Sequence, residues 1–379
     1  MSAVPAALKE LRDAYDDRAA AIRRWRATGA SVVGCVGADV PVELVTAAGA
    51  LPVRLAGDPG RDRALADRYL GGGLDPASRS ILAGLLRGEP DVDLLLVSND
   101  CAGSLRLFYT VRELQRLGAE PALPRTHLVD ILHLPHRTTT RYNRVRLAET
   151  KELLERWAGR RIGEGDLAEA VHQHDEVRRM LRALRRLRTA ERPALRGEDA
   201  LIAIGAGAAL PAGDHAGLLN RLLRAEADLP RHAGRRIYLT GSAHDGPAVY
   251  RAIEDAGHVI VADDHDWGDA LADPLVGEPT LDALAERYQY RGPTSARSSI
   301  RARARQTAAT AERARPDLLV SYVRAMDEAP AWDFPAQREA AGVPAVLLEH
   351  RRYGELGDDA LPLITGALRA ARPKGEAGR

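Results

Sequence analysis

The sequence predicts an α/β fold made of two parallel-sheet domains that are joined by a helical layer. Short runs of leucine and β-branched residues lack the polar alternation of half-exposed strands, as is typical of buried parallel strands. Each run is followed by a polar or glycine-containing turn and then by a helical pattern, which is the βα alternation of a doubly wound sheet. The length of 379 residues is long for one core and suits two domains.

The first 28 residues are predicted to form an N-terminal helix. The stretch MSAVPAALKELRDAYDDRAAAIRRWRATG is amphipathic and lacks the unbroken apolar core of a signal peptide. No apolar run approaches the roughly 18 residues that a membrane span needs. Two cysteines are too few for a disulfide framework, so we expect a cytoplasmic protein with reduced thiols. A formal net charge of +1 favours neither nucleic acid nor an anionic membrane as a partner.

Residues 29–192 are predicted to form the first domain together with a helical extension. Its strand candidates are Ser31–Val36 and Asp93–Val97. Residues 140–192 contain no strand signal and are expected to be helical. The glycine-containing break WAGRRIGEGD divides this region into two helices.

Residues 200–370 are predicted to form the second domain, after a boundary in RPALRGEDA at residues 192–200. Its strand candidates are Arg236–Thr240, His258–Ala262, Leu318–Tyr322 and Ala345–Leu348. The terminal residues 371–379 have the composition of a disordered tail.

The polar residues that follow the strands are the candidate site, because ligands of open parallel sheets bind outside the carboxyl ends of the strands. This predicted rim combines a thiol, a hydroxyl and many carboxylates: Cys35, Asp39, Asn99, Asp100, Cys101, Ser242, His244, Asp245, Asp263, Asp264, His265, Asp266, Asp327 and Glu328. The pattern alone does not fix a reaction. The chain contains neither GxxxxGK[ST] nor GxSxG.

The segment HLVDILHLPH raises the question of a metal site. His127, Asp130, His133 and His136 occur at steps of three. Pro135 breaks helical geometry before the last of them. A loop with satisfied polar residues is therefore the favoured interpretation over zinc.

Four segments resemble the signatures of one enzyme family, the subunits of 2-hydroxyacyl-CoA dehydratases and benzoyl-CoA reductases (2-hydroxyglutaryl-CoA dehydratase D-component type). GCVGADVPVELVTAAGALPVRLAG is similar to the N-terminal signature. SNDCAGSLRLFYTVREL resembles the second signature, a strand end that bears a cysteine. YLTGSAHDGPAVYRAIEDAGHVIVADDHDWG resembles the C-terminal core, and DEAPAWDFPAQREAAGVPAVLLE the last segment. The resemblance covers nearly the whole chain, in order.

The resemblance implies two Rossmann-like (flavodoxin-like) domains with a [4Fe-4S] cluster between them. It implies a homologous partner subunit, in a heterodimer or a homodimer, and an ATP-dependent iron–sulfur activator protein that supplies one low-potential electron. In the dehydratases this electron makes a ketyl radical on the carbonyl of an acyl-CoA substrate, and the reductases act on aromatic thioesters. The chain is thus expected to be a subunit of such a lyase or reductase. Cys101 stands at the family position for a cluster ligand.

The chain departs from the three-cysteine pattern of the family. Asp75, in LDPASRSIL, stands at the position of one cysteine, and Asp327, in RAMDEAPAW, at about the position of another. Clusters are usually held by cysteine thiolates, and carboxylates are harder ligands, so the predicted iron–sulfur site of Cys101, Asp75 and Asp327 is degenerate. Cys35 is not at a family ligand position and suits the core, but it can supply a second thiolate.

Three functions therefore remain open from the sequence. The chain is a redox subunit with a remodelled cluster, a non-redox partner subunit that shapes the CoA-ester pocket, or a repurposed acyl-CoA-binding protein without a cluster, including one that uses its acidic rim for a divalent metal. Glu43 and Ser242 are the catalytic candidates. Glu43 equally suits the first turn of a helix, where acids are favoured, and Ser242 equally suits the closing of a turn.

Overall fold

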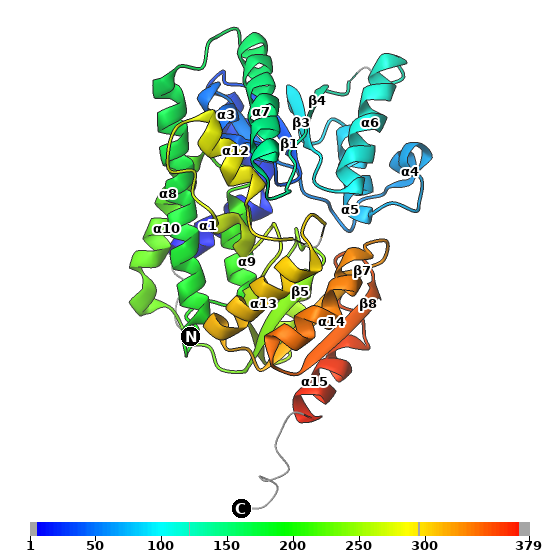
Figure 1. The fold of residues 1–379 in the computed structure, drawn as a ribbon, viewed down its shortest axis with the longest axis vertical. Helices are drawn as coiled ribbons and strands as arrows, with labels where there is room; N and C mark the ends of the chain where they lie inside the picture. Colours follow the sequence, from blue (N-terminus) through cyan, green and yellow to red (C-terminus); the bar gives the residue numbers. More distant parts are fainter. Residues whose placement is uncertain (1–5, 121, 295, 371–379) are drawn as a thin grey trace, which may run out of the picture.

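The computed structural model describes residues 6–120, 122–294 and 296–370, and Figure 1 shows their arrangement. Two four-stranded parallel sheets form its centre. Their strand orders are β2-β1-β3-β4 and β6-β5-β7-β8. Helices surround both sheets, which confirms the predicted α/β fold with two Rossmann-like sheets.

The strands of the first sheet are β1 (Val32–Val36), β2 (Leu51–Arg54), β3 (Leu94–Ser98) and β4 (Arg125–Val129). The two inner strands, β1 and β3, are buried along their whole length, which explains their uninterrupted apolar sequences. Sequence patterns missed the two edge strands. Pro52 interrupts β2, and β4 begins at the exposed Arg125; proline and polar residues are tolerated on sheet edges.

The strands of the second sheet are β5 (Arg235–Gly241), β6 (His258–Asp263), β7 (Leu318–Arg324) and β8 (Ala345–Arg351). All four were predicted. Each continues beyond its predicted carboxyl end, β5 by one glycine and the other three into charged residues. Hydrogen bonding to the neighbouring strands, and not hydrophobicity, sets where these strands end.

The predicted N-terminal helix consists of two helices, α1 (Ala6–Asp16) and α2 (Arg18–Arg26). They are separated at Asp17, whose side chain accepts a hydrogen bond of 2.8 Å from the Ala20 amide and so caps α2. The other helices of this half are α3 (Val42–Ala47), α4 (Ala64–Leu70), α5 (Pro76–Leu85) and α6 (Ala102–Arg116).

The helical region contains α7 (Arg137–Ala158) and α8 (Glu164–Thr189), as predicted. Gly159 ends α7 with a left-handed φ of 66°, a conformation that glycine adopts without strain. The remaining helices are α9 (Gly197–Ala206), α10 (Ala212–Arg224), η1 (Glu226–Asp228), α11 (Ala248–Asp255), η2 (Asp269–Ala272), α12 (Leu281–Gln289), α13 (Ile300–Ala314), α14 (Ala329–Ala341) and α15 (Ala360–Ala370).

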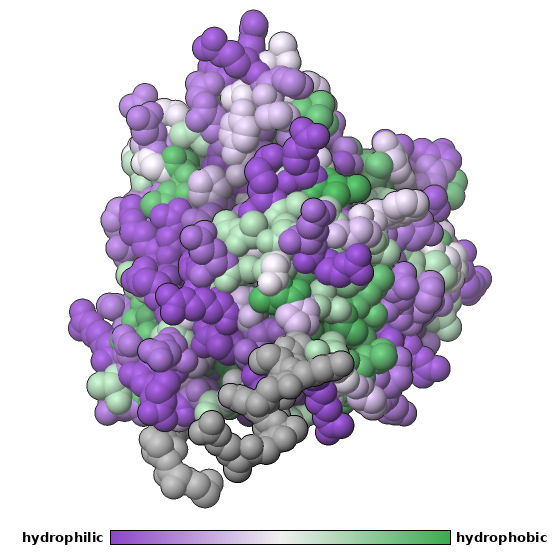
Figure 2. All heavy atoms as spheres, turned by 60° about the horizontal axis from the view of Figure 1, so that its bottom comes forward, coloured by the Kyte–Doolittle hydropathy of each residue, from purple (hydrophilic) through white to green (hydrophobic). Residues whose placement is uncertain are grey.

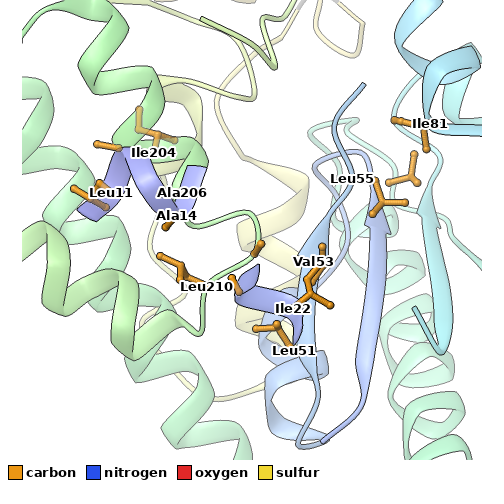
Figure 3. Close-up of a cluster of buried hydrophobic side chains, with 14 of the residues drawn as sticks. Leu11, Ala14, Ile22, Leu51, Val53, Leu55, Ile81, Ile204, Ala206 and Leu210 are labelled. Atoms are coloured by element: carbon orange, nitrogen blue, oxygen red, sulfur yellow. The ribbon is translucent and has the colours of Figure 1, made fainter. Parts of the chain in front are cut away.

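The helical layer packs both halves of the chain together. α9 and α10 contact α1 and α8, and α12 returns from the second sheet to pack on α7. Figure 3 shows part of the shared core, where Leu11 of α1, Ile204 of α9 and Val53 of β2 belong to one cluster of buried side chains. The domain boundary at residues 192–200 stays a prediction, and the predicted tail 371–379 lies outside the described residues.

The surface of the molecule is mostly charged and polar. Figure 2 shows the end that lies at the bottom of Figure 1, where hydrophobic residues gather in patches between hydrophilic ones. The helices in the described part of the chain are too short or too polar to span a lipid bilayer.

Candidate functional site

A cavity of about 390 Å³ lies between the carboxyl ends of the two sheets; we call it the outer cavity. In each sheet the strand order reverses beside the first strand of that half, between β1 and β3 and between β5 and β7. Such switch points open a crevice at the carboxyl edge of a sheet. Residues after both pairs of strands line the outer cavity, including Gly37, Cys101, Gly241 and Asp327.

Cys101 caps the N-terminus of α6 at the rim of the outer cavity. Its Sγ accepts a hydrogen bond of 3.4 Å from the Ser104 amide and lies 3.3 Å from the Ser104 Oγ. Burial, with a further contribution from the neighbouring Asp100 carboxyl, raises the pKa of the Cys101 thiol to about 12. The thiol is therefore neutral at pH 7, and the residue serves as a helix cap in this arrangement.

Asp75 and Asp327, the two predicted partners of Cys101, line the same cavity. Asp75 forms an ion pair of 3.1 Å with the Arg324 guanidinium. Asp327 accepts a hydrogen bond of 2.6 Å from the Ser242 hydroxyl. Burial raises the pKa of Asp327, and this effect outweighs the opposing charge of Arg324. The three positions that the sequence singled out as the cofactor site therefore line one cavity, and their joint binding of a cofactor stays a prediction.

Arg324 organises this part of the outer cavity, and sequence reasoning missed it. Burial alone lowers the pKa of Arg324, but Asp75, Asp327 and Asp245 raise it above its ordinary value. Its backbone amide also donates a hydrogen bond of 3.0 Å to the Ser242 Oγ. Arg324 ends β7 and lies on the predicted rim. A search of the strand ends for basic residues as well as acidic ones would have identified Arg324.

Ser242 holds Asp327 and does not itself line the outer cavity. Its hydroxyl donates to Asp327 and accepts from the Arg324 amide, and its own amide donates to the Tyr322 carbonyl over 2.7 Å. The hydroxyl therefore uses its donor and one acceptor site in contacts with the end of β7 and the residues that follow it. A catalytic role for Ser242 stays a prediction, and these contacts give it a positioning role.

Carboxylates form the deeper wall of the outer cavity. Asp100 is buried, its Oδ2 accepts a hydrogen bond of 2.8 Å from the Ala38 amide, and its Oδ1 has no partner within the described part of the chain. Burial raises the pKa of Asp100, and the charges of Asp39 and Asp266 add to that effect. Asp266 pairs with Arg54 at 3.1 Å. Since protonation of such carboxyls turns acceptors into donors, the wall is suited to hydrogen bonding with a polar ligand.

The structure places Glu43 outside the walls of the outer cavity. Its carboxylate is paired with the Arg178 guanidinium and accepts a hydrogen bond of 2.8 Å from the Tyr288 hydroxyl. Although burial raises the pKa of a carboxyl, the Arg178 charge outweighs it and lowers the pKa of Glu43 to about 2. These contacts tie α3 to α8 and α12. The contacts support a structural role, and substrate positioning by Glu43 stays a prediction.

Cys35 also lies away from the outer cavity. It is 1% exposed within the hydrophobic core around β1, and burial raises the pKa of its thiol to about 12. It lines a second, smaller cavity of about 150 Å³, the inner cavity, on the side of α8 and α12. Ligation of the predicted metal by Cys35 together with Cys101 stays a prediction.

The His-rich segment forms hydrogen bonds in place of a metal cluster. His133 Nε2 lies 2.8 Å from Asp39 Oδ2, and Asp130 accepts a hydrogen bond of 2.8 Å from the Asn99 side chain. No group of three or more histidine, cysteine or acidic side chains in residues 6–120, 122–294 and 296–370 has the geometry of a metal site.

Comparison with known proteins fits these observations. Residues 38–353 match the family described as "2-hydroxyglutaryl-CoA dehydratase, D-component". The chain belongs to this family. This D-component relative is also 21% identical over 341 residues to the (R)-phenyllactyl-CoA dehydratase beta subunit of Clostridium sporogenes, an alignment that covers 86% of this chain and 88% of that protein. The resemblance of the sequence motifs to dehydratase subunits is thereby confirmed.

The donor set of this D-component relative fits a [4Fe-4S] cluster poorly. One thiol faces the outer cavity, and it is a neutral helix cap. Asp75 is engaged by Arg324 and Asp327 by Ser242, and the Arg324 cation lines the space between them. Soft thiolates hold iron–sulfur clusters, whereas carboxylates are harder ligands, and here one carboxylate is paired with a guanidinium and the other accepts a hydrogen bond from a hydroxyl. The arrangement suits an uncharged or hydrogen-bonding ligand better than a metal cluster.

Proposed function

We propose that the chain is a subunit of a 2-hydroxyacyl-CoA dehydratase-like system and that it binds the acyl-CoA thioester in the outer cavity. The observation that carries this proposal is the meeting of both switch points at one cavity, lined by the family-motif positions Asp75, Cys101 and Asp327. Switch points are where open α/β sheets bind their ligands. The family membership supplies the thioester as substrate class.

Arg324 is the residue that we assign to the thioester carbonyl. Its guanidinium is held on one side by Asp75 and on the other by the Ala243 carbonyl, to which it donates a hydrogen bond, so few rotamers remain to be frozen when a ligand binds. A positioned cation stabilises negative charge as it develops on a carbonyl oxygen. Cys101, as a neutral thiol, and the protonatable Asp327 contribute hydrogen bonds in the same wall.

We assign the iron–sulfur cluster and the electron chemistry to a homologous partner subunit. The contacts of Asp75 and Asp327 support this assignment, because both carboxylates are already used within the chain. ATP-driven delivery of an electron by a separate activator then concerns the partner, and this chain shapes the thioester pocket. We place the system in the cytoplasm, where the two free cysteines stay reduced.

The test is anaerobic purification of the chain, alone and co-expressed with a homologous subunit, followed by titration with 2-hydroxyacyl-CoA thioesters. We expect binding to the chain, weakened about tenfold or more in Arg324→Gln, since a hydrogen bond to a charged group contributes about 1.5–3 kcal/mol. Arg116→Gln is the control, because Arg116 pairs with Glu113 on the exposed face of α6. Failure of the chain to bind thioesters in either preparation would refute the proposal.

A second candidate function keeps the cluster in this chain, held by Cys101, Asp75 and Asp327 with Cys35 as a further ligand. The shared lining of the outer cavity by the first three residues favours it. Iron and acid-labile sulfide decide between the two functions. About four irons in the chain purified alone, absent from Cys101→Ala, would establish the cluster here. Iron found solely with the co-purified partner supports the first proposal.

A further inference from the structure

The inner cavity is a distinct space that the proposed function does not use. It holds about 150 Å³ and lies between β1, α8, α12 and the segment from α9 to α10. Most of its wall is apolar, with Val177, Leu181, Ile204 and Leu210 among the lining residues. Gly37, Arg54 and Trp267 line both cavities and therefore form the partition between them. The Arg54 guanidinium lies 4.0 Å from the centroid of the Trp267 ring in this partition.

Arg287 of α12 lines the inner cavity with most of its hydrogen-bonding capacity unused. Its exposed fraction is 5%, and its Nε and Nη1 have no hydrogen-bond partner among the described residues. Its Nη2 makes a long contact of 3.5 Å with the Leu271 carbonyl, and its guanidinium lies 5.4 Å from the centroid of the Tyr288 ring. Within residues 6–120, 122–294 and 296–370, no carboxylate forms an ion pair with it.

The other buried arginines among the described residues form ion pairs with carboxylates, and Arg291 pairs with Asp39. Arg178, Arg188 and Arg303 each form ion pairs with two carboxylates. Burying an unpaired guanidinium costs several kcal/mol, so proteins almost always pair one. Arg287 is the exception to a rule that this chain otherwise follows.

The nearby groups cannot supply the missing partner. Glu43 is held by Arg178 and Tyr288, and so is not free to turn toward Arg287. His215 lies with its Nε2 2.8 Å from the Ala203 carbonyl oxygen, and burial lowers its pKa to about 4. Burial likewise lowers the pKa of His174 to about 4. Both imidazoles are therefore neutral at pH 7. Two other guanidinium groups line the cavity, but Arg178 is paired with Glu43 and Arg54 with Asp266, so that Arg287 faces a mostly apolar space with no free carboxylate among the described residues.

We propose that the inner cavity binds a small carboxylate, whose anionic group pairs with Arg287 and whose apolar part packs against Leu181, Ile204 and Leu210. The volume matches that of a benzene-sized ligand. A carboxylate matches the planar, multi-donor guanidinium in charge and in geometry. The carboxylate has two possible sources: a free small acid, or the end of an acyl chain that passes the partition at Arg54 and Trp267.

Thermal unfolding with free acids tests the site itself and does not depend on the proposed dehydratase function. We expect the wild-type Tm to rise with the concentration of butyrate or benzoate, because a ligand of the native state stabilises it. Arg287→Met should show no such rise. Without added acid its Tm should equal or exceed that of the wild type, since the variant removes an uncompensated buried charge.

Two further variants keep this test decisive. Ala208→Leu, at the wall of the inner cavity, should abolish the rise by filling the space while Arg287 stays in place. Arg144→Met is the matched control. Its Tm should still rise with added acid, because Arg144 is exposed and contacts α12 from outside through Asp282. An absent rise in the wild type, with free acids and thioesters alike, or an equal rise in the Arg287→Met and Ala208→Leu variants, overturns the proposal.

Two kinds of CoA thioester distinguish the free acid from the acyl chain as the source of the carboxylate. In one kind the acyl chain ends in a methyl group, and in the other it ends in a carboxylate. Preference for the carboxylate, lowered about tenfold or more in Arg287→Met, identifies the acyl chain as the source. Equal binding of both thioesters, together with a Tm rise from free acids, identifies a free acid. If thioesters bind without preference for the carboxylate end and free acids do not raise the Tm, the inner site is overturned. The proposed function is then unaffected.

Discussion

Cys101 stands at a motif position of the family and also caps the N-terminus of α6. The motif around it predicted a thiol at a strand end beside the cavity, and the structure places it there. The family resemblance placed Asp75 and Asp327 with it in one site; all three line the outer cavity, and their joint ligation of a cluster stays a prediction. Arg324 escaped prediction, because one arginine among 54 basic residues carries no pattern. Its partners are fixed by tertiary contacts that no local sequence encodes.

Replacement of Cys101 separates its cap from any other function. Cys101→Ser keeps an acceptor for the Ser104 amide and should leave the free energy of unfolding within about 0.5 kcal/mol of the wild type. Cys101→Ala should cost about 1 kcal/mol, as loss of an N-cap does. Urea unfolding measures both. A loss as large in the serine variant as in the alanine variant would show that the thiol does more than cap α6.

Glu43 makes stability depend on acid pH. Its pKa is lowered from 4.5 to about 2 in the folded chain, because Arg178 outweighs burial, so its stabilising charge is present above pH 4.5 and is lost as the pH falls toward 2. Glu43→Gln should cost about 3–5 kcal/mol at pH 7, since it leaves Arg178 with one carboxylate fewer. The fall in unfolding free energy between pH 4.5 and pH 2 should then be shallower in the variant. Identical slopes would contradict this assignment.

At the scale of elements, an uninterrupted apolar run decided which strands could be predicted. The inner strands β1 and β3 and the second sheet carry apolar runs that identify them from sequence. β2 and β4 are edges, where one side of the backbone is free and selection for apolar residues is weak. The packing of α12 on α7 was not predictable either, because the sequence of an amphipathic helix shows which face is buried but not which surface that face contacts.

The turn after β1 depends on Gly37. Its φ is +84°, and a Cβ there would lie 1.9 Å from the Ser98 Oγ and 2.3 Å from Asp100 Oδ2. Gly29 is a natural control, because its φ of +81° is similar and nothing lies within 4 Å of its Cβ position. Gly29→Ala should cost about 1–2 kcal/mol from backbone strain alone. Gly37→Ala should cost about 2 kcal/mol more through the clash at the outer cavity, and equal costs in chemical denaturation would disprove the close approach.

At the scale of the whole molecule, the proposed partner subunit needs a surface on which to bind. Met326 and Trp332 expose 62% and 74% of their surface at and beyond the edge of the outer cavity, where α14 begins. Large exposed aromatic side chains are typical anchors of protein interfaces. Both side chains therefore mark the face on which we expect the homologous subunit.

Trp332→Asp should weaken association with a co-expressed homologous subunit by about tenfold or more, because an anchor contributes more than about 1 kcal/mol. Analytical ultracentrifugation of the purified pair measures it. Leu117→Asp is the control, since Leu117 is 62% exposed at the end of α6. Equal weakening by the two variants would move the interface elsewhere.

The repeated strand order has a consequence for the history of the cavity. The path β1-β2-β3-β4 in the first sheet corresponds step for step to β5-β6-β7-β8 in the second, so that Cys101 after β3 and Asp327 after β7 occupy equivalent places. Such correspondence is what duplication of one ancestral half and fusion of the copies would produce. A thiol persists in one copy and a carboxylate in the other.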